Sequence, residues 1–256
     1  MLNYRNTTIV FVLVLAALVI FTNGLLLVLA VLFLVLLYSL LLFYGSYYVN
    51  SQFFMKVLCS AKTDQKQIAI SFDDGPANNF SNEILAILQS RQVPAAFFCI
   101  GKRISEHPDL LKQIIAEGHI VGNHSFSHHF WFDLFGQKKM LADIEGMSDS
   151  VKKITGLYPI LFRPPYGVTT PIMKKVLAKG NFTAVGWNIR SLDTVIKDEK
   201  KLANKIIGSL QPGAVLLLHD TSASCLKALP AILDEVSARG YEWVRLDKLL
   251  NLQPYA

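Results

Sequence analysis

The chain has 256 residues, of which 52% are hydrophobic and 17% are charged, and its formal net charge is +6. No run of Lys and Arg is longer than two residues, so the sequence lacks the basic stripe of a nucleic-acid-binding protein, and we expect no nucleic-acid partner. The three cysteines, Cys59, Cys99 and Cys225, show no spacing typical of a metal site or a disulfide framework.

The N-terminal part of the chain is strongly apolar. Arg5 is the only charged residue among the first 50, and residues 7–44 contain none. A helix needs about 20 residues to cross a bilayer core, so this segment is too long for one straight span. Asn23-Gly24 is a turn signal near its middle. We therefore expect residues 1–50 to form a membrane anchor of two transmembrane helices, at about 8–22 and 25–44, with one long span as the alternative.

Residues 51–66 predict a polar linker, and residues 67–256 predict one α/β domain. In this domain short apolar runs of strand length alternate with amphipathic stretches of helical length, a pattern typical of a parallel sheet covered on both faces or closed into a barrel. The predicted strands are 67–72, 95–100, 119–122, 159–162, 182–187, 214–218 and 241–246. The predicted helices are roughly 80–90, 108–117, 137–155, 171–179, 199–210 and 226–239.

Ionisable side chains follow five of these strands. Because the carboxyl ends of parallel strands meet at one rim, where such folds place their chemistry, we expect these side chains to share a site. In chain order they are Asp73 and Asp74, His124 and His128, Arg163 with Tyr166 beside it, Arg190 and Asp193, and His219 with Asp220. The second strand ends at Gly101-Lys102 and supplies no clear candidate.

Two histidines and a carboxylate form the most informative pattern in this set. His124 and His128 are four residues apart, the spacing that places two imidazoles on one face of a helical turn. By itself, such a histidine pair is more often a feature of the surface or the core than a ligand pair. By itself, the Asp-Gly-Pro sequence that follows Asp73 is typical of an ordinary turn. Together they predict an open three-ligand site for a divalent metal. One of Asp73 and Asp74 would bind the metal, and the other would remain free as a base.

Four motifs, SFDDGP, HSFSH, RPPYG and LLLHD, occur in this order in the chain. They closely resemble the motifs of the polysaccharide deacetylases of the NodB-homology class, carbohydrate esterase family 4, and the resemblance covers about residues 66–250. It implies a distorted, incomplete (β/α) barrel, here of about seven parallel strands preceded by the transmembrane hairpin. It also implies a metal-dependent hydrolase that removes N-acetyl groups from amino sugars of a polysaccharide or glycolipid.

The same resemblance implies the roles of the metal site. Asp74, His124 and His128 would bind one divalent ion, and Asp73 would be the general base. Arg163 would orient and tune that base. Zinc is the first candidate for an Asp-His-His site, and cobalt or nickel are substitutes.

The remaining motif residues would complete the active site. The resemblance makes His219 the general acid and Asp193 the carboxylate that tethers it. The backbone N–H of Tyr166 would help to hold the oxyanion, and Leu217 would line the acetyl pocket. The family has Trp after the tethering Asp, whereas this chain has Thr194, which leaves the shape of the acyl pocket open.

Three polar residues near the motifs match none of these roles. We expect His119 to be structural and His129 to be solvated. For Arg190 we expect a salt bridge.

Two alternatives to a glycan deacetylase stay open. The predicted membrane anchor, residues 1–50, ends about 20 residues before Asp73, which favours a deformylase or deacetylase of a lipid-linked amino sugar. The other alternative is a catalytically inactive, membrane-held glycan-binding module, against which the complete motif loops argue. The expected partners are therefore an N-acylated amino sugar, in a glycan or a lipid-linked saccharide, and the lipid bilayer.

Two arguments place the domain on opposite sides of the cytoplasmic membrane. Resemblance to enzymes that trim cell-wall or capsule glycans suggests the outside. Arg5 precedes the predicted spans, and Lys56, Lys62 and Lys66 follow them. By the positive-inside rule, these residues favour a hairpin with both ends in the cytoplasm.

Overall fold

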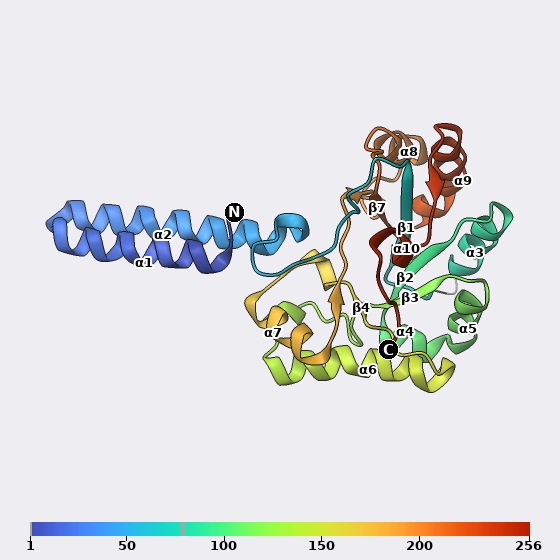
Figure 1. The fold of residues 1–256 in the computed structure, drawn as a ribbon, viewed down its shortest axis with the longest axis horizontal. Helices are drawn as coiled ribbons and strands as arrows, with labels where there is room; N and C mark the ends of the chain where they lie inside the picture. The colour runs from blue at the N-terminus through green and yellow to red at the C-terminus, as the bar shows by residue number, and fades with distance from the viewer. Residues whose placement is uncertain (1, 78–79) are drawn as a thin grey trace.

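The computed structural model describes residues 2–77 and 80–256. An α/β domain carries a pair of long N-terminal helices, which project from it side by side (Figure 1). The strands are β1 (Gln67–Asp73), β2 (Ala95–Cys99), β3 (Ile120–Asn123), β4 (Leu161–Phe162), β5 (Thr183–Ala184), β6 (Ile189–Arg190), β7 (Ala214–His219) and β8 (Glu242–Trp243). The helices are α1 (Tyr4–Phe21), α2 (Gly24–Tyr47), α3 (Ser81–Ser90), α4 (Gly101–Glu106), α5 (Pro108–Ala116), α6 (Gln137–Thr155), α7 (Pro171–Gly180), α8 (Glu199–Ile207), α9 (Ala223–Ala238) and α10 (Leu246–Leu250).

The sheet is parallel and open. Its order is β5-β4-β3-β2-β1-β7-β6, and β8 pairs with the start of β1 off this path. Among the described residues no ladder joins β5 to β6, so the barrel is open there. The segment before β1 forms isolated bridges with Val185, just after β5, and with the start of β7. Leu58 pairs with Val185, and Ser60 pairs with Ala214. The predicted α/β class and incomplete barrel are confirmed.

Alternation along β1 separates two apolar layers. Ile68, Ile70 and Phe72 face the layer of surrounding helices, while Ala69 belongs to a second cluster inside the barrel. Since successive side chains of a strand point to opposite faces, Ser71 and Asp73 share the inner face with Ala69. The rule applies equally to β7, where Leu216 and Leu218 pack outward and Val215 packs inward. The inner face therefore carries both the apolar interior and the polar groups of the rim.

Three short elements were not predicted. Helices α4 and α10 have only six and five residues, and strand β6 has two, so none offers a full period of the hydrophobic pattern. The seventh predicted strand, 241–246, is present only as β8, and β6 takes its place on the main path of the sheet. The six helices predicted for the domain agree with the structure to within about three residues at each end.

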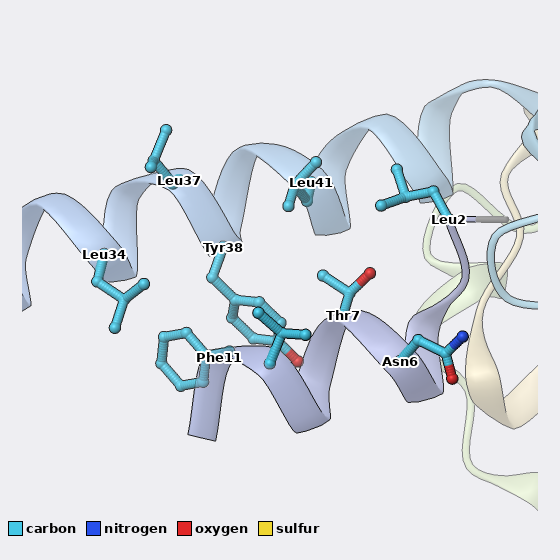
Figure 2. Close-up of a pocket in the computed structure, with 9 residues that line it drawn as sticks. Leu2, Asn6, Thr7, Phe11, Leu34, Leu37, Tyr38 and Leu41 are labelled. Atoms are coloured by element: carbon cyan, nitrogen blue, oxygen red, sulfur yellow. The ribbon is translucent and has the colours of Figure 1, made fainter. Parts of the chain in front are cut away.

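Helices α1 and α2 have the length and composition to cross a membrane. They turn at Asn23-Gly24, where Gly24 has a φ of 56°, a backbone conformation that glycine adopts readily. Phe11 of α1 stacks on Tyr38 of α2 with ring centroids 4.3 Å apart. Figure 2 shows these rings beside a mostly apolar pocket of about 370 Å³ between the two helices.

The helix pair is fastened to the domain at one end. The Tyr4 N–H donates to the Phe53 carbonyl at 2.9 Å. Near the end of α2, the Ser46 carbonyl accepts from the Thr169 N–H and the Gly45 carbonyl accepts from the Thr169 hydroxyl, both at 3.1 Å. Part of the predicted linker also packs into the domain, because Phe53, Phe54, Met55, Val57 and Cys59 are buried in one cluster with α7. The start of α1 and the end of α2 thus lie together against the domain.

Candidate active site

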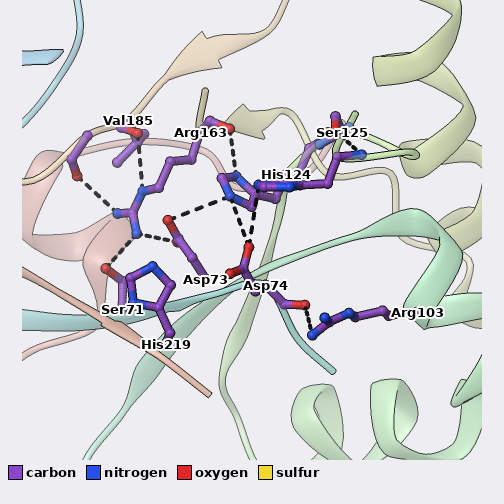
Figure 3. Close-up of polar contacts among 12 residues, drawn as sticks. Ser71, Asp73, Asp74, Arg103, His124, Ser125, Arg163, Val185 and His219 are labelled. Atoms are coloured by element: carbon purple, nitrogen blue, oxygen red, sulfur yellow. Dashed lines mark hydrogen bonds and ion pairs between the residues drawn. The ribbon is translucent and has the colours of Figure 1, made fainter. Parts of the chain in front are cut away.

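Asp73 and Asp74 lie at the end of β1, and the backbone conformation there points their side chains in different directions. Asp73 is the last residue of the strand and is buried on its inner face. Asp74 has a φ of 77°, in the left-handed region that non-glycine residues seldom adopt. The Asp74 carbonyl accepts from Arg103 of α4 at 2.9 Å, so an arginine that sequence reasoning missed holds this turn (Figure 3).

A buried arginine fixes the Asp73 carboxylate. Arg163 Nη1 donates to Asp73 Oδ1 at 2.7 Å and to the Ser71 hydroxyl at 2.9 Å, while Nη2 donates to the Gly186 carbonyl. The guanidinium lies 3.9 Å above the Phe98 ring. Burial lowers the pKa of Arg163, whereas the adjacent Asp73 carboxylate raises it. A fully buried ion pair of this kind needs further hydrogen bonds to offset its desolvation, and the Ser71 hydroxyl and the carbonyls of Val185 and Gly186 accept from this guanidinium. Ser71 was not predicted.

Asp74, His124 and His128 come together as a candidate metal centre. The Asp74 Oδ1 atom lies 3.6 Å from Nε2 of His124 and 3.5 Å from Nε2 of His128, and one ligand atom from each residue lies within 4.8 Å of the others. The second carboxylate oxygen of Asp73 faces the same place, 3.8 Å from His124 Nε2.

The two histidines do not share a helical turn, and that prediction was wrong. They belong to the loop after β3, where Ser125 has a φ of 65° and His128 a φ of 44°. Asn123 Oδ1 accepts from the Ser125 N–H at 2.8 Å. Asp143 of α6 accepts through Oδ1 from the N–H groups of residues 126 and 127 at 2.9 and 3.1 Å. These contacts, rather than helical geometry, bring the two imidazoles together.

The donor set fits a divalent transition metal. His124 Nδ1 lies 2.8 Å from the Arg163 carbonyl, and since a carbonyl only accepts, Nδ1 carries the proton and Nε2 keeps its lone pair. Burial and the neighbouring His124 lower the pKa of His128 to about 4, which keeps it neutral as a metal ligand must be. Two imidazoles and one carboxylate suit zinc, cobalt or nickel and leave further coordination positions open.

His219 and Asp193 form a second pair on the same rim. His219 Nδ1 lies 2.8 Å from Asp193 Oδ1, and the His219 N–H donates to Oδ2 at 2.8 Å. Burial by itself lowers the pKa of His219, but the hydrogen bond to Asp193 and the charges of Asp193, Asp73 and Asp74 together raise it to about 9. The predicted tether is therefore present in geometry, although the following residue is an exposed Thr194 instead of the family's Trp.

Tyr166 and Leu217 differ in their exposure. Leu217 is on β7, two residues before His219 on the inner face, and is buried. Tyr166 has a φ of 58°, and its half-exposed ring lies 4.7 Å from the His128 ring. The ring centroid of exposed Phe130 lies 6.1 Å from that of Tyr166 and 4.6 Å from that of Trp131. The mouth of the site thus has an aromatic edge that the sequence reasoning did not assign.

A further buried carboxyl lies beneath the Asp74 turn. Ser81 donates to Asp220 Oδ2 at 2.6 Å, and a side chain at Gly75 would collide with this carboxyl. Burial raises the pKa of Asp220 to about 7. Because Gly75 directly follows Asp74, the close approach of Asp220 explains why the turn carries glycine at this point.

The three unassigned residues have simpler surroundings. His119 is buried, and its Nδ1 accepts from the Ala95 N–H at 3.1 Å, as expected of a structural residue. His129 is exposed, as expected. The Arg190 side chain is exposed, and within the described chain it forms no ion pair, so the expected salt bridge was wrong.

The parallel sheet and its rim of Asp, His and Arg side chains define an α/β barrel-like protein with a candidate metal centre. Residues 60–185 match the family model described as polysaccharide deacetylase. The chain is 31% identical over 192 residues to the peptidoglycan-N-acetylmuramic acid deacetylase PdaA of Bacillus subtilis, covering 73% of each chain. The chain therefore belongs to the polysaccharide deacetylase family, carbohydrate esterase family 4, which includes hydrolases of carbon–nitrogen bonds other than peptide bonds.

Solved structures agree on the fold. A peptidoglycan N-acetylglucosamine deacetylase superposes with a TM-score of 0.75 at 26% identity, covering 78% of this chain and 95% of the other. A family 4 pseudoenzyme from Bacillus anthracis superposes with a TM-score of 0.72 at 21% identity, covering 76% of this chain and 69% of the other. Since the second of these is described as a pseudoenzyme, the likeness in fold says nothing by itself about turnover.

Proposed function

We propose that the protein removes N-acetyl groups from amino sugars of peptidoglycan, with Asp74, His124 and His128 as ligands of one divalent ion, zinc first among the candidates. The observation that carries the proposal is the convergence of this ligand set with the Arg163–Asp73 and Asp193–His219 pairs on one rim. The relatives that deacetylate N-acetylglucosamine and N-acetylmuramic acid of peptidoglycan support the choice of substrate.

Asp73 is the proposed general base. Arg163, itself bonded to Ser71, holds Asp73 through Oδ1, so Oδ2 faces the histidine ligands and can accept a proton from water there. When bound, a divalent ion would polarise the amide carbonyl and lower the pKa of water in the site. Because Arg163 binds Oδ1, the other oxygen, Oδ2, is the one left to accept the proton.

His219 is the proposed general acid. Its raised pKa keeps it protonated at neutral pH, and its Nε2 is free of the Asp193 contact, which is made through Nδ1. It would donate a proton to the leaving sugar nitrogen. The Tyr166 N–H would hold the carbonyl oxygen as negative charge develops on it, and Leu217 would form a wall of the acyl pocket.

We also propose residues 1–50 as a membrane anchor, with α1 and α2 in the cytoplasmic membrane, and residues 67–256 as the catalytic domain.

One observation favours a second candidate substrate, a lipid-linked amino sugar that the protein would deformylate or deacetylate. Thr169 lies three residues after Tyr166 and is hydrogen-bonded to Gly45 and Ser46 at the end of α2. The mouth of the site is thus close to the end of a candidate membrane span.

The test is hydrolysis by the metal-loaded full chain of a panel of soluble glycans and lipid-linked sugars, with acetate and formate measured separately. We expect acetate from peptidoglycan fragments, and no release after Asp74→Ala. Formate from a lipid-linked sugar, without acetate from any glycan, would replace the first candidate with the second. A chain that binds metal and glycan but releases neither acid would be the inactive binding module.

A further inference from the structure

A basic groove lies where the helix pair meets the domain. It is formed by the start of α1, residues 52–56 and α7, and it encloses about 870 Å³. Figure 1 shows α7 on the side of the domain nearest the helices. The groove is separate from the candidate active site, because none of the metal ligands, Asp73 or His219 lines it.

The charge of this basic groove is entirely positive. Its charged lining residues are Arg5, Lys56, Lys174 and Lys175, all of them exposed. Within the described parts of the chain, none of the four forms an ion pair with a carboxylate. The surrounding sequence cannot supply one nearby, since residues 1–63 and 157–192 contain no Asp or Glu. Four cations without counter-charges around one concavity favour an anionic ligand.

The floor of the groove is apolar. Phe53 and Phe54 are buried beneath it, and the Tyr4 ring lies 5.3 Å from the Phe54 ring. A small hydrophilic anion would leave this floor in contact with water. A ligand with an anionic head and an apolar body would cover both parts of the groove.

The position of the groove favours a membrane lipid as the ligand with an anionic head and an apolar body. Tyr4 and Arg5 begin α1, and exposed Tyr44, Tyr47 and Tyr48 lie at the adjacent end of α2. If α1 and α2 lie in the membrane, as proposed above, these tyrosines are at the level of the lipid headgroups, where aromatic belts are found. The groove would then open at the depth of the lipid phosphates.

We propose that this basic groove binds the headgroup phosphate of an anionic membrane phospholipid. Arg5 and Lys56 would contact the phosphate from the helix side, and Lys174 and Lys175 from α7. Because α7 belongs to the catalytic domain and Arg5 to the anchor, the bound lipid would join the two and limit how far the domain tilts on the membrane. The inference rests on the membrane placement of α1 and α2, and it is independent of the reaction at the metal centre.

The experiment uses the full chain in a neutral detergent. Dioctanoyl phosphatidylglycerol, dioctanoyl phosphatidylcholine and inorganic phosphate are titrated separately, and bound lipid is counted by native mass spectrometry. We expect phosphatidylglycerol to bind about tenfold or more tightly than phosphatidylcholine, because each basic residue near an anionic headgroup adds to the affinity. Equal binding of the two lipids would overturn the proposal. Displacement of phosphatidylglycerol by equimolar inorganic phosphate would show a free-phosphate site instead.

Matched variants assign the binding to this groove. One variant combines Arg5→Gln, Lys56→Gln, Lys174→Gln and Lys175→Gln, and the control combines Lys138→Gln, Lys153→Gln, Lys200→Gln and Lys248→Gln, four exposed lysines elsewhere. We expect the first to lose phosphatidylglycerol selectivity and the control to keep it. Equal losses would mean that overall charge, not the groove, attracts the lipid. If the first variant fails to fold, Lys174→Gln with Lys175→Gln on the exposed face of α7 tests the same point. Acetate release from a soluble substrate should be unchanged in all of them.

Discussion

Two adjacent carboxylates can have different roles because the backbone sends them in different directions. Asp73 ends a strand and points into the barrel, where the buried Arg163 neutralises it. Asp74 takes a left-handed conformation and approaches both histidines. The repulsion expected of such a pair is therefore offset on each side by a different cation, a guanidinium for one and a metal ion, when bound, for the other.

The first prediction separates the two aspartates. We expect Asp73→Asn to retain about one metal ion per chain but to lower turnover about 10²- to 10⁴-fold, because it removes a general base and not a ligand. Asp74→Asn should lose the metal as well as the activity. Metal content by mass spectrometry and acetate release give the two readouts. Metal loss in Asp73→Asn together with metal retention in Asp74→Asn would show that the two roles are reversed.

The second prediction concerns His219 in the metal-free protein. Its pKa should be about 9, measured by NMR of the imidazole, and Asp193→Asn should lower it because the hydrogen bond and the charge are lost. Since the pKa is raised in the folded state above its ordinary 6.5, the pair stabilises the fold fully below about pH 6.5 and this contribution disappears as pH rises through about 9.

Denaturation at several pH values checks the sign of this effect. The loss of stability in Asp193→Asn should be largest in acid to neutral solution and smaller above about pH 9, with a remainder because Asp193 also accepts from the His219 N–H. Asp109→Asn, an exposed change of the same charge, is the control. An unchanged imidazole pKa in Asp193→Asn would rule out the tether.

At the level of elements, the candidate metal ligands depend on a helix that supplies none of them. The loop after β3 carries His124 and His128, and Asp143 of α6 accepts two of its N–H groups. Asn123 adds a second support, because its amide donates to the Ile144 carbonyl and the Ser148 hydroxyl while its oxygen holds Ser125. Helix α6 therefore sets the distance between the two imidazoles.

The third prediction tests this support. We expect Asp143→Ala to weaken metal binding about 10- to 100-fold without removing a ligand, as is usual for residues that orient metal ligands. The matched control is Asp149→Ala, an exposed carboxylate on the same helix. Competition with a chromogenic chelator gives both affinities. Equal metal affinity in the two variants would show that the loop keeps its shape without Asp143.

At the scale of the whole molecule, the helix pair fixes which ends of the chain share a side of the membrane. Helix α1 starts, and helix α2 ends, against the domain. If both helices span the bilayer, the N-terminus and the domain lie on the same side. Arg5 before the spans, and Lys56, Lys62 and Lys66 within about 20 residues after them, favour the cytoplasmic side by the positive-inside rule.

The fourth prediction is the side of the membrane. Lys138 is exposed, and Cys59, Cys99 and Cys225 are buried, so Lys138→Cys provides one reactive thiol. We expect an impermeant thiol reagent to label it only after the cells are permeabilised, because a cytoplasmic domain is shielded in intact cells. The parent chain is the control for background. A cytoplasmic domain would meet amino sugars as lipid-linked precursors, the second candidate substrate. Labelling of intact cells would place the domain outside, where polymerised peptidoglycan, the first candidate, is accessible.

Local pattern in the sequence was sufficient for the long elements and for the motif residues. Strand runs such as residues 67–72 are largely apolar on both faces, because helices cover one face and the barrel interior lies against the other. A run of this kind can be recognised from a few consecutive residues. The rim residues could be grouped from the rule that parallel strands end together. Residues 7–44 predicted two apolar helices because the turn at Asn23-Gly24 is also encoded locally.

Only the tertiary structure decided how these residues meet. Ser71, Arg103 and Asp143 support the site from β1, α4 and α6, and no spacing along the chain connects them with the residues they hold. The histidine pair was assigned to a helical turn because its spacing of four is helical, whereas long-range hydrogen bonds stabilise a loop with positive φ angles. Short-range periodicity determines the elements, and contacts between residues distant in the chain determine the conformation of the loops that join them.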